Sequence, residues 1–407
     1  MAGTCSGAAE PGPDYREFNR PPHDYFSRKP TDRFARLRPK LESATATLPV
    51  DTEVHFLTAL LGLLEVPVSS QMLVFSTTSL QLSRITPTNP RALYFNDEVY
   101  LGFIPGGKIE VLALDRDLGA VFYIFDIPRG AATAAPIQVE RATRCMNCHA
   151  GDDTGHVPGL VVKSVVSGPN GGSLDSFRRE QSGHEIPLQE RFGGWYLTDI
   201  GDWTNHWGNT MGRLSDGEVL RLPNRPEDKV AWDRYPRRTS NLLPQLLHEH
   251  QAGFVNRVVE AAYRTRTIVR ISGHALTPDQ DRELDQQADR VVRYLLFAEE
   301  ASLSPAAIRS DEAFIEDFRR NRREVGGRSL KDLDVRARLL RYRCSYMIYS
   351  PVFDGLPEVI KKKVYVRLAR ALKPGRDDAA ASHLDDDEKR AIREILLGTL
   401  NDLPNGW

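Results

Sequence analysis

The chain has 407 residues, of which 41% are hydrophobic and 27% charged, and its formal net charge at pH 7 is −1. This composition is ordinary for a globular protein, and the length suffices for two or three domains or one large one. The balanced charge gives no overall attraction to nucleic acid, and no stretch approaches the roughly 20 apolar residues of a membrane-spanning helix. We therefore expect no nucleic-acid partner and no integral membrane segment.

The first 230 residues are expected to be rich in strands. Residues 1–30 combine proline, glycine and charge, which predicts a flexible N-terminal arm. Apolar residues at helical spacing then predict helices over residues 32–45 and 52–66. Short β-prone runs separated by turn residues predict an antiparallel meander between residues 70 and 128. Its strands are expected at residues 71–76, 92–95, 99–104, 109–114 and 120–125.

The rest of the chain changes from strands to helices. A further strand is expected at residues 160–166, and residues 203–226 are expected to be mostly irregular. From about residue 237 the apolar spacing is helical. Helices are expected at residues 240–265, 278–303, 310–320, 330–349, 357–372 and 385–400. The sequence therefore predicts an α+β fold, with a β-meander in the N-terminal half and a mainly helical C-terminal half.

One short motif, Cys145-Met146-Asn147-Cys148-His149, follows the predicted meander. C-x-x-C-H is the attachment site of a c-type haem. On one helical turn the two thiols lie on the same side, where they can form thioether bonds to the porphyrin vinyl groups. The next residue, His149, is then placed to bind the iron as its proximal ligand. The motif predicts one covalently bound haem c, held by Cys145, Cys148 and His149.

Two other chemistries of paired cysteines remain as alternatives. A structural zinc site needs four ligands, usually in two close pairs, whereas Cys5 and Cys344 stand singly and far from the motif. A thioredoxin-type dithiol begins a long helix after a strand, whereas a polar, glycine-containing loop follows this motif at residues 150–155. Cys344 lies in a helix-like run, and we expect it to pack as a small hydrophobic residue.

A covalent haem fixes the expected location and organisation of the protein. Haem c is attached outside the cytoplasm, so we expect a periplasmic or extracytoplasmic protein. Because residues 1–5 show no apolar signal segment, we infer that a native signal peptide was removed. Beyond the arm, the predicted regions are a strand-rich haem-binding region at residues 31–230 and a helical region at residues 231–407. Whether the two fold independently is left open.

The group that faces His149 across the iron decides what the haem does. His250 is the first candidate because it lies on the apolar stripe of the helix predicted from residue 240. The competing interpretation is a buried histidine that is hydrogen-bonded within the core. His206 and then Met211 follow, in a stretch long enough to return over the haem, although a methionine more commonly fills the core. The remaining candidates, His156 and His184, are weaker and are expected to be solvated. His248 lies off the apolar stripe and is also expected to be solvated.

Three further residues are candidates for contacts with the haem. Arg144 and Arg191 can pair with the propionates, because a guanidinium matches a carboxylate in a bidentate way. An exposed surface role is the alternative for both. Trp195 can pack on the porphyrin, and core packing is its alternative.

Eight phrases spread along the chain carry a resemblance. They are residues 73–76 (LVFS), 90–97 (PRALYFND), 145–149 (CMNCH), 191–196 (RFGGWY), 247–251 (LHEHQ), 294–297 (YLLF), 327–330 (GRSL) and 343–350 (RCSYMIYS). In these phrases the chain resembles a family of large, mono-haem cytochrome c domain proteins known mainly from planctomycete-type bacteria. The resemblance covers nearly the whole chain after about residue 50, and it implies a haem without implying a reaction.

The same resemblance bears on the sixth ligand. The family segment that matches Glu249-His250-Gln251 recurs, which favours His250. The family phrase around His206 often reads His-Met-Gly-Asn, where this chain has Trp207. This departure argues against a family-wide methionine ligand at position 207.

Two functions of different class follow. The first is periplasmic electron transfer to a redox partner protein by a six-coordinate haem. The second is a haem c enzyme of peroxidase-like or oxygen-using type, with a small-molecule substrate and with His250 or His206 as the distal acid or base. Its motivation is size, because about 400 residues far exceed a usual domain of roughly 100–150. A haem-based sensor is a third class. The carrier assumes least, and whether the protein is an enzyme is left open.

Overall fold

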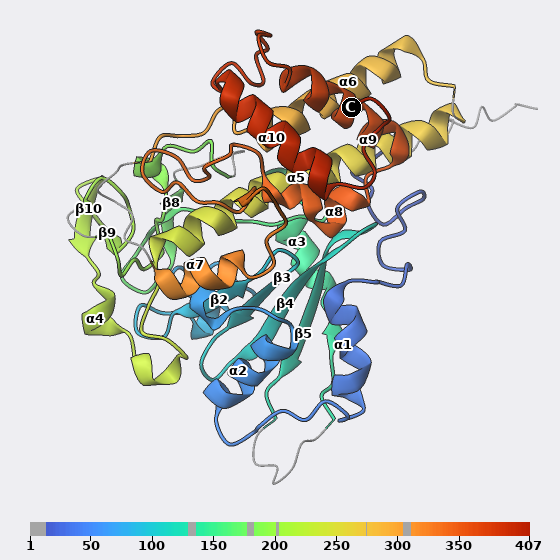
Figure 1. Cartoon of the computed structure of the whole chain (residues 1–407). Helices are drawn as coiled ribbons and strands as arrows, with labels where there is room; N and C mark the ends of the chain where they lie inside the picture. Colours follow the sequence, from blue (N-terminus) through green and yellow to red (C-terminus); the bar gives the residue numbers. More distant parts are fainter. Residues whose placement is uncertain (1–13, 129–135, 177–182, 201–202, 274, 304–310) are drawn as a thin grey trace, which may run out of the picture.

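The computed structural model describes residues 14–128, 136–176, 183–200, 203–273, 275–303 and 311–407. Figure 1 shows an antiparallel sheet built by the first half of the chain, with the helices of the second half stacked against one side of it. The mixed α+β content expected from the sequence is confirmed.

The six strands of the main sheet follow one another in sequence order, and every neighbouring pair is antiparallel. The predicted meander is therefore confirmed, with β6 as an added edge strand. The strands are β1 (Met72–Val74), β2 (Arg91–Phe95), β3 (Val99–Phe103), β4 (Lys108–Asp115), β5 (Gly119–Asp126) and β6 (Glu140–Arg141).

Alternation along the strands gives the sheet two faces of different character. On one face, Tyr123 of β5 packs on Phe34 of α1 (Arg33–Glu42), with 4.7 Å between the ring centroids. We call the opposite side of the sheet the motif face. The register places two rows of side chains across it. They are Phe95, Tyr100, Leu112 and Phe122 in one row, and Leu93, Gly102, Glu110 and Ile124 in the other.

Most of the predicted helices are present close to the expected positions. Helix α6 begins with a capping box between Thr277 and Gln280 and ends at Leu295, earlier than expected, just before Phe297 adopts a positive φ of 58°. Besides α1, the main helices are α2 (Glu53–Leu63), α5 (Leu242–Ser272), α6 (Pro278–Leu295), α7 (Glu312–Arg319), α8 (Pro351–Asp354), α9 (Glu358–Ala371) and α10 (Asp386–Thr399).

The helix predicted over residues 330–349 is wrong. The segment follows the short strand β12 (Arg328–Ser329) and is irregular apart from a 3-10 turn, Tyr346–Tyr349. Side chains from other elements bind its amides: Glu300 accepts from the Leu339 N–H at 2.8 Å, and Glu388 accepts from the Arg343 N–H at 2.8 Å. Tertiary hydrogen bonds thus replace the helical ones that the local pattern favours.

Residues 203–226 also differ from the prediction, because they contain a β-hairpin. Strands β9 (Thr210–Ser215) and β10 (Glu218–Pro223) pair around Asp216 and Gly217, whose φ values are 52° and 83°. Asp-Gly is a strong signal for this type of tight turn. The strand expected at 160–166 is shorter and later, as β7 (Val165–Ser167), which pairs with β8 (Ser173–Ser176).

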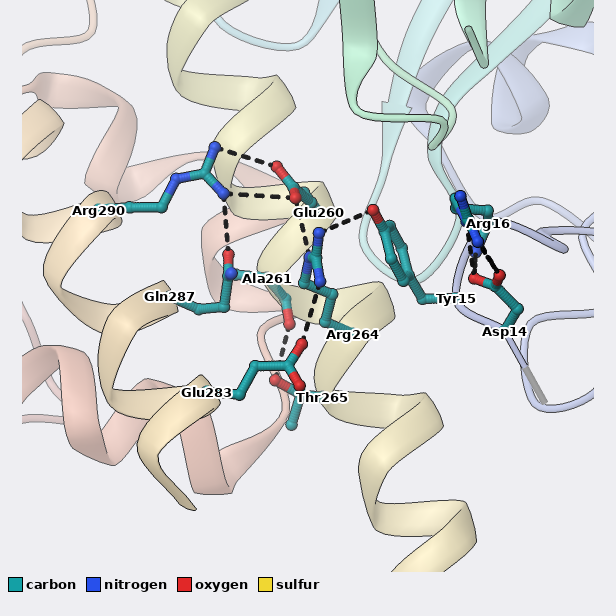
Figure 2. Close-up of polar contacts among 10 residues, drawn as sticks. All are labelled: Asp14, Tyr15, Arg16, Glu260, Ala261, Arg264, Thr265, Glu283, Gln287 and Arg290. Carbon is teal, nitrogen blue, oxygen red and sulfur yellow. Dashed lines mark hydrogen bonds and ion pairs between the residues drawn. The ribbon is translucent and has the colours of Figure 1, made fainter. Parts of the chain in front are cut away.

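The flexible arm expected at residues 1–30 is packed over the part that the structure describes. Tyr25 is 1% exposed, and its hydroxyl donates to the Ala120 carbonyl at 2.7 Å. Figure 2 shows Tyr15 beside α5, where its hydroxyl accepts a hydrogen bond from Arg264 at 2.7 Å. Contacts of these aromatic side chains therefore hold residues 14–30 in place, although their composition predicts a flexible arm. Residues 1–13, with Cys5, lie outside the described residues.

The two halves of the chain share one hydrophobic core, which runs from Tyr25 to Trp407. Helix α5 is buried over most of its length because it packs between the motif side of the sheet and the other helices. The change of pattern near residue 230 is thus not a boundary between separate cores. No helix among the described residues is long and apolar enough to cross a membrane.

Candidate haem-attachment site

The C-x-x-C-H motif lies on a short helical turn. A 3-10 turn over Thr143–Cys145 leads into α3 (Met146–His149), and the buried side chain of Met146 fixes this turn to the core. Cys145 is half-buried, Cys148 is exposed, and both are free thiols. The two sulfur atoms are therefore available for covalent attachment.

His149 is held with one nitrogen bound and its other nitrogen left for a ligand. Its Nδ1 lies 2.9 Å from the Gly159 carbonyl oxygen, so Nδ1–H donates and the lone pair is on Nε2. Its ring packs against Phe122 of β5 at 4.5 Å. Burial lowers the pKa of His149 to about 4, against the weaker opposing effect of the Gly159 carbonyl. The imidazole is thus neutral at pH 7, which is the form that binds iron.

The loop after the motif is fixed by Asn256 of α5. The Asn256 Oδ1 accepts from the Leu160 N–H at 2.8 Å, and its Nδ2 donates to the Leu160 carbonyl at 2.8 Å and to the Asp153 carbonyl at 3.3 Å. A Cβ at Gly159 would lie only 2.4 Å from the Asn256 Oδ1, so this close approach requires glycine. Asn256 therefore positions the Gly159 carbonyl, which in turn orients His149.

A second contact between the same loop and α5 lies one turn further along the helix. Gly155, with φ 65°, approaches the carboxylate of Glu260, to which an added Cβ would come within 3.1 Å. Figure 2 shows Glu260 between Arg264 and Arg290, with Arg264 also reaching Glu283 of α6 at 3.0 Å. This cluster ties the loop side of α5 to α6.

The motif face offers an apolar surface beside His149. Leu112 and Ile124 lie on inner strands of the sheet, yet they stay partly exposed. A pocket of about 580 Å³ opens on this face and reaches Ala142 and Arg144, just before Cys145. Its volume falls within the roughly 300–1,000 Å³ typical of cofactor sites. Arg144 is exposed at its edge, where it can pair with a carboxylate.

An ion pair crosses the same face. Arg91 Nη2 lies 2.6 Å from Glu110 Oε2, and a Cβ at Gly102 would come within 2.7 Å of that same nitrogen. The guanidinium therefore lies across Gly102. Burial raises the pKa of Glu110, but Arg91 and the hydrogen bonds from Gln81 and Ser79 outweigh it and lower the pKa overall. Glu110 is thus a carboxylate at neutral pH.

The Cys145 thiol is not activated as a nucleophile. Burial, with the nearby charge of Glu110, raises its pKa to about 12. A reactive dithiol needs a cysteine whose pKa is lowered, because the thiolate is the nucleophile. This environment argues against the redox-dithiol alternative.

His250, the leading sequence candidate for the distal side, has both ring nitrogens bonded in the core. Its Nδ1 lies 2.7 Å from the Nδ1 of His184, and its Nε2 lies 2.7 Å from the Ser345 hydroxyl. The ring also stacks on Phe297 at 4.6 Å. His250 faces inward as its stripe predicted, but this geometry is that of the competing core interpretation. His184 is 3% exposed, so the expectation that it is solvated is wrong.

His206 lies just before the β9–β10 hairpin, and Met211 lies in strand β9. His206 is 7% exposed, and its Nε2 lies 3.0 Å from the Trp203 carbonyl. Met211 is half-buried and pairs with Leu222 across the hairpin. The side chain of His156 is 42% exposed, so it is partly solvated, and its Nε2 lies 3.1 Å from Asp152.

Arg191 and Trp195 are both buried, and each is hydrogen-bonded to backbone carbonyl groups. Arg191 is 2% exposed; it donates to the Ile186 and His184 carbonyls and pairs with Glu249 at 3.2 Å. The buried carboxylate of Glu249 needs a counter-ion, which Arg191 supplies, so the exposed surface role considered for Arg191 is wrong. Its pairing with a haem propionate stays a prediction. Trp195 donates to the Lys163 carbonyl at 2.8 Å, and its ring lies 6.2 Å from that of His248.

His248 is the residue that sequence reasoning misplaced. It is 7% exposed, and its ring lies 5.5 Å from Tyr100 and 5.6 Å from Phe95 on the motif face. The expectation of a solvated side chain is wrong because α5 is buried on nearly all sides, so a position off the main stripe is still covered. The all-round burial of α5 could have been inferred only from its packing partners.

Comparisons with known proteins add no further information about this site. A scan against protein-family models, a search of curated proteins and a search of solved structures each found no match. Within the described residues, no group of three or more His, Cys, Asp or Glu side chains is arranged to hold a metal ion. A haem c does not need such a group, because the porphyrin supplies four of the iron ligands.

The buried pair of His184 and His250 predicts acid sensitivity. Burial, with a smaller effect of Arg257, lowers the pKa of His250 to about 3, and burial also lowers that of His184 well below its usual value. An unfolded histidine titrates near about 6.5, so between these values the unfolded state binds protons that the folded state does not. The free energy of unfolding should be level above about pH 6.5 and fall below it, by about 1.4 kcal/mol per pH unit for each such histidine.

Urea unfolding at several pH values measures this slope. The variant His250→Gln, which keeps hydrogen-bonding groups but cannot titrate in this range, should show a smaller slope below about pH 6.5 than the parent protein. Equal slopes in the two proteins would show that His250 does not contribute.

Proposed function

We propose that this chain is a c-type cytochrome that carries one haem, bound covalently to Cys145 and Cys148, and that acts in periplasmic electron transfer. The observation that carries the proposal is the C-x-x-C-H turn, with His149 oriented by the Gly159 carbonyl beside a partly exposed apolar sheet face. The haem, when bound, supplies one-electron chemistry at its iron.

The surrounding residues suit this group. The neutral imidazole of His149 presents Nε2 for the proximal position, and Phe122 keeps the ring in place. Leu112 and Ile124 offer apolar contact to the porphyrin and exclude water from it. At the edge of the pocket, Arg144 and Lys108 can pair with the propionates.

A second candidate function is a haem c enzyme of peroxidase-like or oxygen-using type. The observation that favours it is that the motif face also carries polar side chains that can act on a small molecule bound beside the haem. In this case the polar groups of the motif face, His248 and Arg91, are better placed than His250 to act as distal groups, since both ring nitrogens of His250 are bonded.

Expression with haem-attachment machinery tests the proposal. The secreted protein should gain the mass of one haem that survives denaturation, and its reduced form should give the absorption bands of haem c. A folded protein without covalent haem, from cells that mature a control cytochrome c, would contradict the proposal. A low-spin spectrum unchanged by carbon monoxide supports the carrier, whereas a high-spin spectrum that responds to it supports the enzyme.

A further inference from the structure

We propose that His248 of α5, and not His250, supplies the second axial ligand to the iron, opposite His149. This inference rests on the haem proposed above at Cys145, Cys148 and His149. Three independent features of the structure carry it: a free nitrogen on His248, its place on the motif face, and the helix that it shares with Asn256.

The first feature is an unsatisfied imidazole nitrogen. The Nδ1 of His248 is buried and has no hydrogen-bond partner among the described residues. Buried polar atoms are almost always bonded, because leaving one unpaired costs about 1–3 kcal/mol. His250 lies two residues away and differs in this respect, because both of its ring nitrogens are hydrogen-bonded. A ligand that accepts the lone pair of His248 would account for its position.

The second feature is the shared sheet face. His149 packs on Phe122 of β5 and His248 packs on Tyr100 of β3, and the register places Leu112 of β4 between these two aromatic residues. Strands lie about 4.8 Å apart, so the two packing positions are separated by about 10 Å. The two histidines thus contact this row of side chains on either side of Leu112, which is partly exposed. That arrangement suits an iron with one imidazole on each side.

The Arg91–Glu110 pair supports the same placement. The pair lies across Gly102, in the middle of the motif face whose Phe122 and Tyr100 contact the two histidines.

The third feature is that one helix, α5, carries both His248 and the residue that positions the His149 loop. Asn256, which positions the His149 loop, and His248 belong to the same helix, eight residues apart, which corresponds to about 12 Å along its axis. A single rigid helix therefore sets the positions of both proposed ligands relative to each other. Two strong nitrogen ligands give a six-coordinate iron that is closed to small molecules, which suits an electron carrier.

The test compares spectra of haem-loaded variants of the full chain. The parent protein should be low-spin and indifferent to carbon monoxide. His248→Ala should become high-spin and bind carbon monoxide, and added imidazole should restore the low-spin spectrum. The matched control His250→Gln, on the same helix and also buried, should keep the parent spectrum.

Two results would overturn the inference: a His248→Ala protein that retains its haem and its low-spin spectrum, or a parent protein that is already high-spin. If His248→Ala does not fold, His248→Met serves in its place. Its thioether should leave the iron six-coordinate with a raised reduction potential, and an unchanged potential would exclude His248 as a ligand. Absence of covalent haem in every variant, the parent included, would instead refute the proposed function, so the two failures are distinguishable.

Discussion

Replacing both Cys145 and Cys148 with alanine is expected to abolish covalent haem attachment. The thioether bonds need both sulfur atoms, and these two thiols are the ones that the α3 turn presents together. Haem that remained would be held only through its axial ligands and apolar contacts, and denaturation would release it. Intact-protein mass and haem staining of a denaturing gel measure the loss directly.

The remaining described cysteine provides the matched control. Cys344 is 0% exposed and free, and burial raises the pKa of its thiol, so Cys344→Ala should keep the full haem content. Because Cys148 is exposed, Cys148→Ala alone should change the free energy of unfolding of the haem-free protein by no more than about 0.5 kcal/mol. Covalent haem found in the double variant would contradict the assignment of the motif.

The variant Asn256→Leu is expected to destabilise the protein and to disturb the haem environment together. Leucine keeps the branched outline of asparagine, although it is larger, and it cannot bind the backbone N–H and carbonyl of Leu160, which is 2% exposed. Two buried backbone groups would lose their partner, at about 1–3 kcal/mol each, so the free energy of unfolding should fall by about 2–6 kcal/mol. Denaturant unfolding with and without haem measures this.

The spectrum distinguishes positioning from mere stability. With the loop loosened, the Gly159 carbonyl no longer fixes the Nδ1 of His149, and the haem-loaded variant should show a shifted reduction potential or a mixed spin state even where it is folded. Arg270→Ala, at an exposed position of the same helix, should change neither property. An Asn256→Leu protein with the stability and spectrum of the parent would show that Asn256 does not position the site.

Local sequence patterns were sufficient where local forces decide the structure. The meander was predictable because its short apolar runs are separated by turn residues, and neighbouring strands in such a chain pair with each other. The predictions were wrong where distant side chains intervene. Residues 330–345 lose their expected helix to hydrogen bonds from Glu300 and Glu388, and residues 14–30 are anchored by aromatic residues that contact the sheet and α5.

The sequence alone determined the attachment chemistry that we propose, because five consecutive residues on one helical turn contain both thiols and the proximal imidazole. Only the tertiary structure indicated which histidine is placed to face them. His248 and His250 are two residues apart on a helix that is buried on nearly all sides, so hydrophobic spacing cannot tell their surroundings apart. Their partners come from distant parts of the chain: His184 and Ser345 satisfy His250, whereas Phe95 and Tyr100 surround His248 without binding its free nitrogen.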